Sequence, residues 1–275
     1  MSSVVLQRTL ASSCTVEGVG LHSGKPVRVT LFPASENSGI FFRAGETIIP
    51  AAIQYVEVTP RCTTLKKGKK QISTVEHFLA ACWGSEIDNL EAVVEGEELP
   101  GGDGSSIFWF NVFRKVGFQI QSSPRKYLIV KENIKVGENR HYLFAFPDEE
   151  FRVWYFLDGG ENGHFSQALE FSENDDSDKL LSARTFAFSR EVAEILQKGW
   201  GKGIREKAFI LNEEGESSIP LRFPGEAAGH KILDLMGDLM LTGKRVKGCF
   251  IGIRSGHALN REMVKRITEA SSEEN

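Results

Sequence analysis

The sequence predicts an α+β fold made of two similar units, on the strength of three observations. Segments typical of half-buried strands, in which hydrophobic and polar residues alternate, come first in each half of the chain. Segments with helical spacing follow, with one strand between them. The two runs are separated by a polar stretch at residues 121–124 that ends in proline, as a linker would. We therefore expect an N-terminal α+β unit at residues 1–122 and a C-terminal one at 125–275, although no clear internal sequence repeat accompanies them.

The N-terminal half begins with strands and ends with helices. Its strands are expected at residues 27–31, 39–43 and 90–94. The basic run 66–70, which Gly68 interrupts, is expected at a solvated hairpin tip. Ser73 and Glu76 have the spacing of a capping box, which predicts a helix from near Thr74 to Gly84. After a turn at 100–104, a second helix is expected to carry its hydrophobic face on Phe108, Val112, Phe113 and Val116.

The C-terminal half repeats this order. Strands are expected at residues 127–131, 142–146, 152–157 and 246–253. Polar, Gly- or Asp-rich stretches at 159–163 and 173–178 predict loops. Helices are expected at 189–198, at 226–241 and from near His257 onward, and the tail at 271–275 is expected to fray.

Composition excludes several classes of protein. Of the 275 residues, 41% are hydrophobic and 25% charged, which is too apolar for a disordered chain. The net charge of −4 argues against electrostatic binding of nucleic acid or an anionic membrane through an extended surface. No apolar run approaches the roughly 20 residues that span a bilayer, and the N-terminus lacks the pattern of a secretory signal. Four dispersed cysteines without a CxxC pair favour reduced thiols, so we expect a cytoplasmic protein. We also expect a monomer.

The helix expected at 226–241 carries an unusual polar row. His230, Asp234 and Asp238 are four residues apart, so they share one face of the helix, and the residues between them are mostly apolar. A surface His–Asp pair worth a few tenths of a kcal/mol is the simplest interpretation of such spacing. Buried polar groups, in contrast, need partners, because leaving them unpaired is costly.

Two more histidines favour a buried functional site over a surface His–Asp pair. His77 follows Glu76 in the earlier helix, and His257 lies in a glycine-led turn into the last helix. Two histidines and an aspartate suit a catalytic zinc that keeps its fourth position for water, although Fe²⁺ accepts the same ligands. Glu76 has the chemistry of a general base, but it is also the reciprocal arm of the expected capping box. His22 is interpreted as a loop residue.

At this point the sequence resembles a known family, the zinc-dependent UDP-3-O-acyl-N-acetylglucosamine deacetylases of lipid A biosynthesis. The matching stretches run in order from residue 7 to about residue 267: QRTL at 7–10, GVGLHSG at 18–24, CTTL at 62–65, STVEH at 73–77, DN at 88–89, DGS at 103–105, SARTF at 182–186, HKILD with GD at 230–238, and SGHALN at 255–260.

The resemblance implies two α+β domains packed as a sandwich, with helices inside, sheets outside and the site between them. It implies that zinc is bound by His77, His230 and Asp234. It makes Glu76 the general base and His257 the protonated partner, which Asp238 orients.

The same resemblance implies further contacts with substrate. Lys231 and Thr185 would face the carbonyl and its developing oxyanion. Phe186 and Phe188 would line the sugar and acyl surroundings, and Cys62 would lie near the entrance. Arg140 would meet the diphosphate by a looser match. Simpler roles for these residues are core and turn packing for Thr185 and Phe186, a solvated charge for Lys231 and a small buried thiol for Cys62.

The sequence departs from the family pattern in four places. Lys207 stands where the family has asparagine, and Gly229 stands where it has arginine. The loop at 100–102 reads Pro-Gly-Gly, and the segment at 157–171, which helps to form the acyl passage in the family, is short. These departures leave the zinc chemistry intact and affect the acyl and sugar sites.

The expected activity is hydrolysis of the N-acetyl group of UDP-3-O-acyl-N-acetylglucosamine, with release of acetate. The expected partner is thus a UDP-linked acylated amino sugar, with neither nucleic acid nor an integral membrane segment involved. Two alternatives stay open. One is a non-catalytic relative that binds nucleotide sugars, and the other is a zinc deacetylase for a different acylated amino sugar.

Overall fold

The N-terminal half folds around a five-stranded sheet whose inward side chains are the alternating hydrophobic residues. A computed structural model describes residues 4–159 and 164–272. The strands of this sheet are β2 (Cys14–Val19), β3 (Pro26–Pro33), β4 (Ile40–Ala44), β5 (Thr47–Pro50) and β9 (Leu90–Glu95). Their order is β2-β3-β9-β4-β5, and β9 is parallel to β4, whereas the other neighbours are antiparallel.

The C-terminal half contains a second sheet. Its strands are β12 (Ile134–Glu138), β13 (His141–Phe146), β14 (Phe151–Asp158), β15 (Ser166–Ser172) and β18 (Arg245–Ile253). Their order is β12-β13-β18-β14-β15, with β18 parallel to β14 and the other pairs antiparallel. A short strand, β11 (Tyr127–Ile129), pairs with the first residues of β18.

The two sheets have the same topology. In each, the strand made last lies in the centre, between the second and third strands, and it is parallel to the third. In each half, the last α-helix before this central strand and the first one after it occupy the same places in the chain order. The prediction of an α+β fold with two similar units is therefore confirmed, whereas the exact division at residues 122 and 125 stays a prediction.

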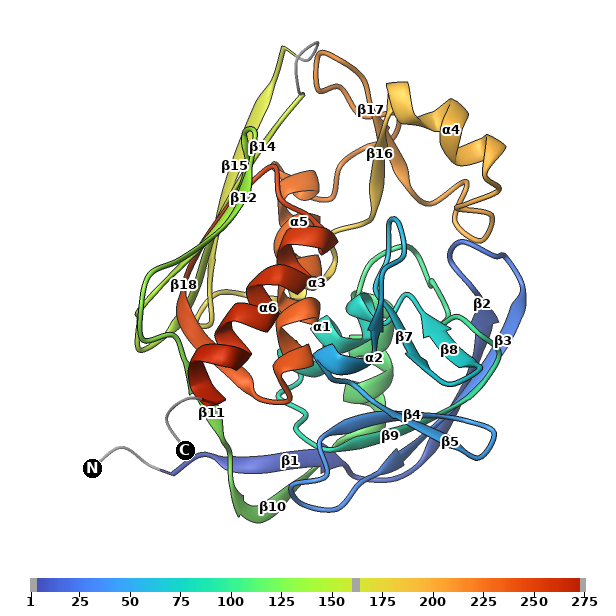
Figure 1. Ribbon diagram of the computed structural model, residues 1–275. Coiled ribbons are helices and arrows are strands. Elements are labelled where there is room, and N and C mark those ends of the chain that lie inside the picture. The colour runs from blue at the N-terminus through green and yellow to red at the C-terminus, as the bar shows by residue number, and fades with distance from the viewer. Residues whose placement is uncertain (1–3, 160–163, 273–275) are drawn as a thin grey trace.

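Four helices lie between the sheets (Figure 1). They are α1 (Glu76–Gly84), α2 (Ile107–Val116), α5 (Glu226–Leu239) and α6 (His257–Ser272). The helix α1 is buried along its length against α5, and the aromatic rings of Phe78, Trp109 and Phe113 pack edge to face beneath them. The core therefore lies between the two sheets, around the helices that carry the motifs.

The remaining elements are short and connect these layers. They are η1 (Ile53–Tyr55), β6 (Val56–Glu57), the hairpin β7 (Thr64–Lys67) and β8 (Lys70–Ser73), α3 (Ser177–Leu181), β16 (Phe186–Phe188), η2 (Ser189–Glu191), α4 (Val192–Gln197), β17 (Phe209–Leu211) and η3 (Met240–Thr242). The hairpin confirms the turn expected at the basic run. At the upper right of Figure 1, β16, α4 and β17 form a separate flap.

Several local predictions are wrong. The segment 121–124 is no linker, because it belongs to β10 (Phe118–Pro124), which pairs with β1 (Leu6–Leu10) and whose Gln121 accepts a hydrogen bond from Asn89. The loop expected at 173–178 overlaps α3, which Asp176 caps. In α2 the expected face does pack against the core, but the prediction missed Trp109 and Phe110, which are buried as well. The loop expected at 159–163 lies outside the described residues except for residue 159. In the tail expected at 271–275, residues 273–275 lie outside the described residues as well.

The helix α1 begins at Glu76 rather than near Thr74, and it has no capping box. Ser73 Oγ accepts a hydrogen bond from the Thr64 hydroxyl instead of capping the helix. The Glu76 carboxylate accepts from the backbone N–H of Thr63, 2.9 Å away, and so does not turn back to its own helix. Tertiary partners therefore replace both arms of the expected box, and the capping role for Glu76 is excluded.

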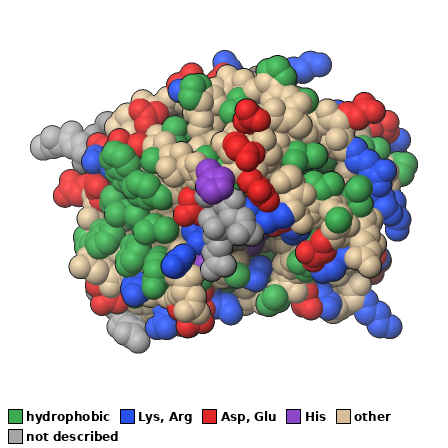
Figure 2. Space-filling model, turned by 90° about the horizontal axis from the view of Figure 1, so that it is seen from above, with side chains coloured by type: hydrophobic (Ala, Val, Ile, Leu, Met, Phe, Trp, Pro, Cys, Tyr) green, Lys and Arg blue, Asp and Glu red, His purple; other side chains and the backbone are tan. Residues whose placement is uncertain are grey.

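The outer faces of the two sheets differ in chemistry. The N-terminal sheet presents ion pairs, Arg28 with Glu17 and Arg43 with Glu91. On the C-terminal sheet the pairing registers place Phe144, Ile251 and Trp154 side by side, and Trp154 is 38% exposed. Figure 2 shows hydrophobic side chains gathered on the side where the C-terminal sheet lies. Among the described residues, no helix is long and apolar enough to cross a membrane.

Candidate metal centre and active site

The two central helices bring the polar motifs together. Glu76 and His77 occupy the first turn of α1, and the row His230, Asp234 and Asp238 lies along α5. The helices approach closely at Gly237, where an added Cβ would lie 2.1 Å from the carbonyl oxygen of Glu76. Only a residue without a side chain fits between the helices here, so Gly237 sets the distance between the two groups of motif residues.

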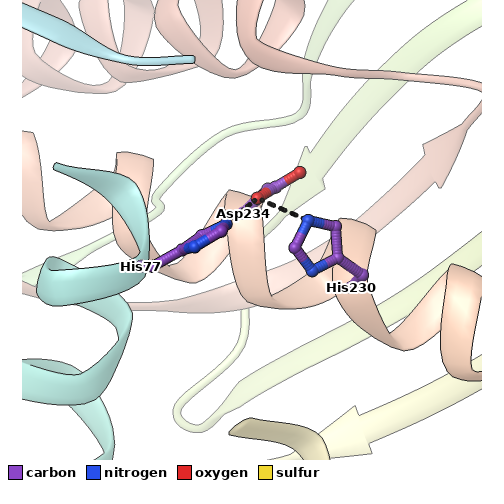
Figure 3. A group of neighbouring side chains, drawn as sticks. All are labelled: His77, His230 and Asp234. Carbon is purple, nitrogen blue, oxygen red and sulfur yellow. Dashed lines mark ion pairs between the residues drawn. The ribbon is translucent and has the colours of Figure 1, made fainter. Parts of the chain in front are cut away.

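His77, His230 and Asp234 form a compact set of ligand atoms (Figure 3). The three atoms lie within 4.8 Å of one another, and all three residues are buried. Asp234 Oδ1 lies 3.7 Å from His77 Nε2 and 3.5 Å from His230 Nε2. Within the described residues this oxygen is buried without a hydrogen-bond partner. A buried, unpartnered carboxylate oxygen facing two imidazole nitrogens fits a metal ion that accepts N and O ligands.

Protonation also suits metal binding at this group. His230 Nδ1 donates to the carbonyl oxygen of Ala183, 3.1 Å away, because a carbonyl can only accept. Burial lowers the pKa of His230 to about 3, so the ring is neutral and the Nε2 lone pair is free. Burial disfavours the charge on Asp234, but the positive groups around it, Lys231 and His257 among them, outweigh burial and hold the pKa of Asp234 well below its usual range. Lys231 Nζ donates to Asp234 Oδ2 over 2.8 Å.

His257 lies beside the metal group as a cation. Its Nδ1 is 2.9 Å from Asp238 Oδ2, and Asp238 also accepts from Thr63 Oγ1 and Asn260 Nδ2. Burial works against a charge on the imidazole, but Asp238 and then Asp234 raise the pKa of His257 to about 9. The ring is therefore protonated at neutral pH, with its Nε2–H directed at the site.

Glu76 faces this cation. Its Oε1 lies 3.8 Å from His257 Nε2, while Oε2 is held by the Thr63 amide. Burial raises the pKa of Glu76, and the neighbouring imidazoles of His257 and His77 only partly counter this. A carboxylate with a raised pKa is a better proton acceptor, which is the property a general base needs.

A cavity of about 220 Å³ opens onto these side chains. The residues predicted for the site that line it are Glu76, His77, Thr185, Phe186, His230, Lys231, Asp234 and His257. Asp238 stands behind His257, and Phe188 packs behind Phe186 with ring centres 5.6 Å apart. Two predicted residues lie elsewhere. Cys62 lines a neighbouring hollow of about 460 Å³, and Arg140 is exposed in the turn between β12 and β13.

The opposite wall of the cavity is apolar and was not predicted. It is formed by α4 and β17 of the flap and by the segment between them, through Val192, Ile195, Leu196, Trp200, Ile204, Ala208, Phe209 and Ile210. The segment 157–171, expected near the acyl passage, instead contributes the β14–β15 strands, and none of its described residues lines this cavity. The spacing 192, 195 and 196 is that of one apolar helix face, within the helix that the sequence predicted at 189–198 without a role in the site.

His22 is also part of the site, contrary to its interpretation as an ordinary loop residue. Its side chain lines the cavity together with Glu76 and His77, and burial lowers its pKa. Glu98 fixes the turn, because its carboxylate accepts from the backbone N–H groups of His22 and Ser23 at 2.6 and 2.9 Å. No sequence spacing connects residue 22 to residue 77, so only the tertiary structure places it here.

A second, wider hollow lies on the other side of His257. It is lined by His141 and by three arginines, Arg61, Arg254 and Arg261. Arg254 also pairs with Asp158 at 3.2 Å. This concentration of cations next to His257 is suited to an anionic group.

The departures from the family pattern have local explanations. Lys207 Nζ donates to the carbonyl oxygen of Gly102 over 2.8 Å, so it ties the flap to the Pro-Gly-Gly loop. In that loop, a Cβ on Gly101 would lie 2.7 Å from the Leu21 side chain. Gly229 packs under the ring of Phe223, where a Cβ would meet it at 3.0 Å. None of these residues belongs to the His77, His230 and Asp234 group.

Comparison with known proteins agrees with this site. The family model described as UDP-3-O-acyl N-acetylglycosamine deacetylase matches residues 7–269. A UDP-3-O-acyl-N-acetylglucosamine deacetylase of Myxococcus xanthus is 35% identical over 95% of this chain and 86% of its own length. Proteins of the same name from Thermosynechococcus vestitus and Coxiella burnetii are 35% and 33% identical, over 96% and 98% of this chain and 94% and 92% of their own lengths.

Proposed function

The chain belongs to the UDP-3-O-acyl N-acetylglycosamine deacetylase family, and we propose that it hydrolyses the N-acetyl group of UDP-3-O-acyl-N-acetylglucosamine, with release of acetate, in lipid A biosynthesis. One observation carries this proposal beyond family membership. A buried His/His/Asp group, the carboxylate of Glu76 and the cation His257 all face one cavity. A protein that only binds a nucleotide sugar has no need of a base and an acid arranged around such a group.

We assign His77, His230 and Asp234 as ligands of Zn²⁺, with Fe²⁺ as the other metal that this donor set accepts. The bound ion would supply Lewis acidity, which polarises the acetyl carbonyl and lowers the pKa of water. Support for the assignment comes from the neutral ring of His230 and from the unpartnered Oδ1 of Asp234.

The remaining steps fall to the side chains around the cavity. Glu76 would accept a proton from the attacking water, whose oxygen adds to the acetyl carbon. Lys231 and Thr185 would stabilise the oxyanion that develops on the carbonyl oxygen. The C–N bond then breaks, and His257 gives its Nε2 proton to the departing amine. Asp238 would hold the His257 ring in place and keep it charged.

We assign the two kinds of wall to the two ends of the substrate. The arginine-lined hollow beside His257 suits the diphosphate, since guanidinium groups bind phosphate oxygens in pairs. The apolar flap wall suits the fatty acyl chain. Phe186 and Phe188 would line the sugar and acyl surroundings, Cys62 would lie near the entrance, and the contact of Arg140 with the diphosphate stays a prediction.

We further propose that the protein acts as a monomer in the cytoplasm. The four cysteines form no disulfide, in keeping with a reducing compartment.

The test is release of acetate or free amine from UDP-3-O-acyl-N-acetylglucosamine by the purified protein, before and after chelation and after zinc is added back. We expect chelation to abolish release and zinc to restore it. A folded, zinc-loaded protein that binds the substrate without turnover would instead indicate a binding relative. Faster release from a different acylated amino sugar would indicate another substrate.

A further inference from the structure

We propose that Glu226 is a positioning residue for the metal ligand His230, which it serves through Arg184 and the Ala183 carbonyl. This inference rests on the proposed metal site but not on the deacetylase reaction. Glu226 starts α5 and lies one helical turn before His230. It does not line the cavity, so any effect on the chemistry must pass through other residues.

Glu226 is completely buried and accepts four hydrogen bonds. Three come from Arg184: its backbone N at 3.0 Å, Nε at 2.7 Å and Nη2 at 3.0 Å. The fourth comes from the backbone N of Arg222 at 2.7 Å. Both carboxylate oxygens are thus used, in the bidentate geometry that makes an arginine pair directional. The segment around Arg184 is therefore fixed to the first turn of α5.

The residue next to Arg184 contacts the ligand itself. Ala183 is fully buried, and its carbonyl oxygen accepts from His230 Nδ1 at 3.1 Å. Glu226 and His230 belong to the same helix. The hydrogen bonds between Glu226 and Arg184, here called the clamp, therefore fix the Ala183 carbonyl relative to the His230 imidazole that binds it. The bond keeps the proton on Nδ1 and leaves the Nε2 lone pair directed at Asp234.

The other histidine ligand has no such support. His77 Nδ1 is buried and has no hydrogen-bond partner among the described residues. Within the part of the chain that the structure describes, His230 is the only one of the two imidazoles held by an outer partner, and that partner belongs to the segment that Glu226 binds. The orientation of the metal group therefore depends on one buried carboxylate that itself donates no ligand atom.

The same clamp continues into the cavity wall. The chain passes from Arg184 to Thr185, whose backbone N donates to the Gly104 carbonyl over 2.7 Å, and then to Phe186. Both side chains line the cavity. A loosened clamp would therefore disturb these residues together with His230.

A purely structural ion pair is the competing explanation, because breaking a buried pair is destabilising wherever it lies. The two explanations differ in what they predict for a metal. A structural pair changes stability and leaves the affinity of the folded protein for zinc unchanged. A positioning residue changes the zinc affinity of protein that is still folded.

The decisive variant is Glu226→Gln, which keeps size and shape and removes the charge. Zinc affinity is measured by competition with a chromogenic chelator, with the thermal midpoint of the metal-free protein recorded alongside. We expect affinity to fall roughly 10–100-fold, the usual effect of losing an outer partner of a ligand. Glu17→Gln is the matched control, since it removes an exposed pair with Arg28 and should leave zinc affinity unchanged. Affinity within twofold of wild type in folded Glu226→Gln would overturn the proposal.

Two further measurements keep the proposal testable if Glu226→Gln fails to fold. If Glu226→Gln does not fold, Arg184→Lys keeps the charge but loses the bidentate fork, and an intermediate loss of affinity is expected. In wild-type protein, the His230 Nδ1 proton should exchange slowly with solvent by NMR, and a proton found on Nε2 instead would contradict the proposal. Failure of wild-type protein to bind zinc would refute the metal site itself, which is a separate result.

Discussion

The N-terminal and C-terminal units share one strand order but contribute unequally to the site. The N-terminal unit supplies Glu76 and one ligand, His77, from the first turn of α1. The C-terminal unit supplies the other two ligands from the equivalent helix α5, together with Asp238 and His257. The segments inserted before these helices differ as well, a hairpin at 51–75 and the flap region at 173–225. A repeated topology thus fixes where the helices meet, whereas the side chains on them decide the chemistry.

The largest effect is expected from removing a metal ligand, and this change tests whether both units contribute to the metal site. His77→Ala and His230→Ala each remove one ligand, from opposite halves, and each should abolish zinc-dependent turnover and weaken zinc binding, because three donors hold the ion. Acetate release and bound zinc measured by elemental analysis check this. If His77→Ala retained full zinc and activity, the C-terminal unit alone would hold the metal. The exposed Arg114→Ala is a suitable control.

Glu76→Gln separates the base from the ligands. It keeps the hydrogen bond from the Thr63 amide but removes the proton acceptor, so kcat should fall by about 10²–10⁴ with KM nearly unchanged. Bound zinc should stay at the wild-type level, and steady-state kinetics with metal analysis measure both quantities. Loss of zinc together with kcat would show that Glu76 acts on the metal group rather than on a proton.

Gly237→Ala tests the contact between the two equivalent helices. The added methyl group would meet the Glu76 carbonyl at 2.1 Å, so α1 and α5 must separate. We expect a loss of about 1–3 kcal/mol in the free energy of unfolding, from urea titration, and a lower kcat. Gly256→Ala is the matched control, since a Cβ there meets nothing within 4 Å. Equal stabilities for the two variants would show that the helices are not tightly apposed at Gly237.

Asp103→Asn tests a pH-dependent link between the units. Asp103, from the N-terminal half, pairs with Arg222 at 2.6 Å. Burial raises its pKa, but hydrogen bonds from Ser105 and Arg222 outweigh burial, and the net shift is downward. A lowered pKa contributes stability above the unfolded value near 4 that is lost as pH falls through the folded value. The variant should lose roughly 1 kcal/mol at pH 7 and converge with wild type in acid, as measured by denaturation at several pH values. A pH-independent difference would contradict this.

The smallest effect is expected on the outer faces. Arg28→Ala removes an exposed ion pair from the N-terminal sheet and should leave both the free energy of unfolding and the activity close to wild type, because solvent screens such a pair. Thermal denaturation and acetate release check both. A large loss would mean that the polar face stabilises its sheet more than surface ion pairs usually do.

Periodicity and motif spacing were enough to predict the class of fold, the long helices and the polar row of the metal-bearing helix, whereas the set of metal ligands was implied only by the resemblance to the family. The row on α5 was visible because its members lie four residues apart. Contacts between distant segments were not visible. Thr63 donates to Asp238 across 175 positions, and this tertiary bond belongs to the same network that removes Glu76 from its expected cap. Sequence patterns also missed His22 and the arginine-lined hollow, since loops from several segments converge there.

The shared topology has a consequence for the order of folding. In each sheet the central strand is the last to be synthesised, so the hairpins β2–β3 and β4–β5 wait for β9, and β12–β13 and β14–β15 wait for β18. Pairing of this kind joins segments far apart in sequence and is slow. The helix α5 packs against β14 and β15, and the sheet that they belong to is complete only once β18 has been made. A nascent chain therefore exposes its metal ligands until nearly all of it has been made, and capture of the metal should be a late event in biogenesis.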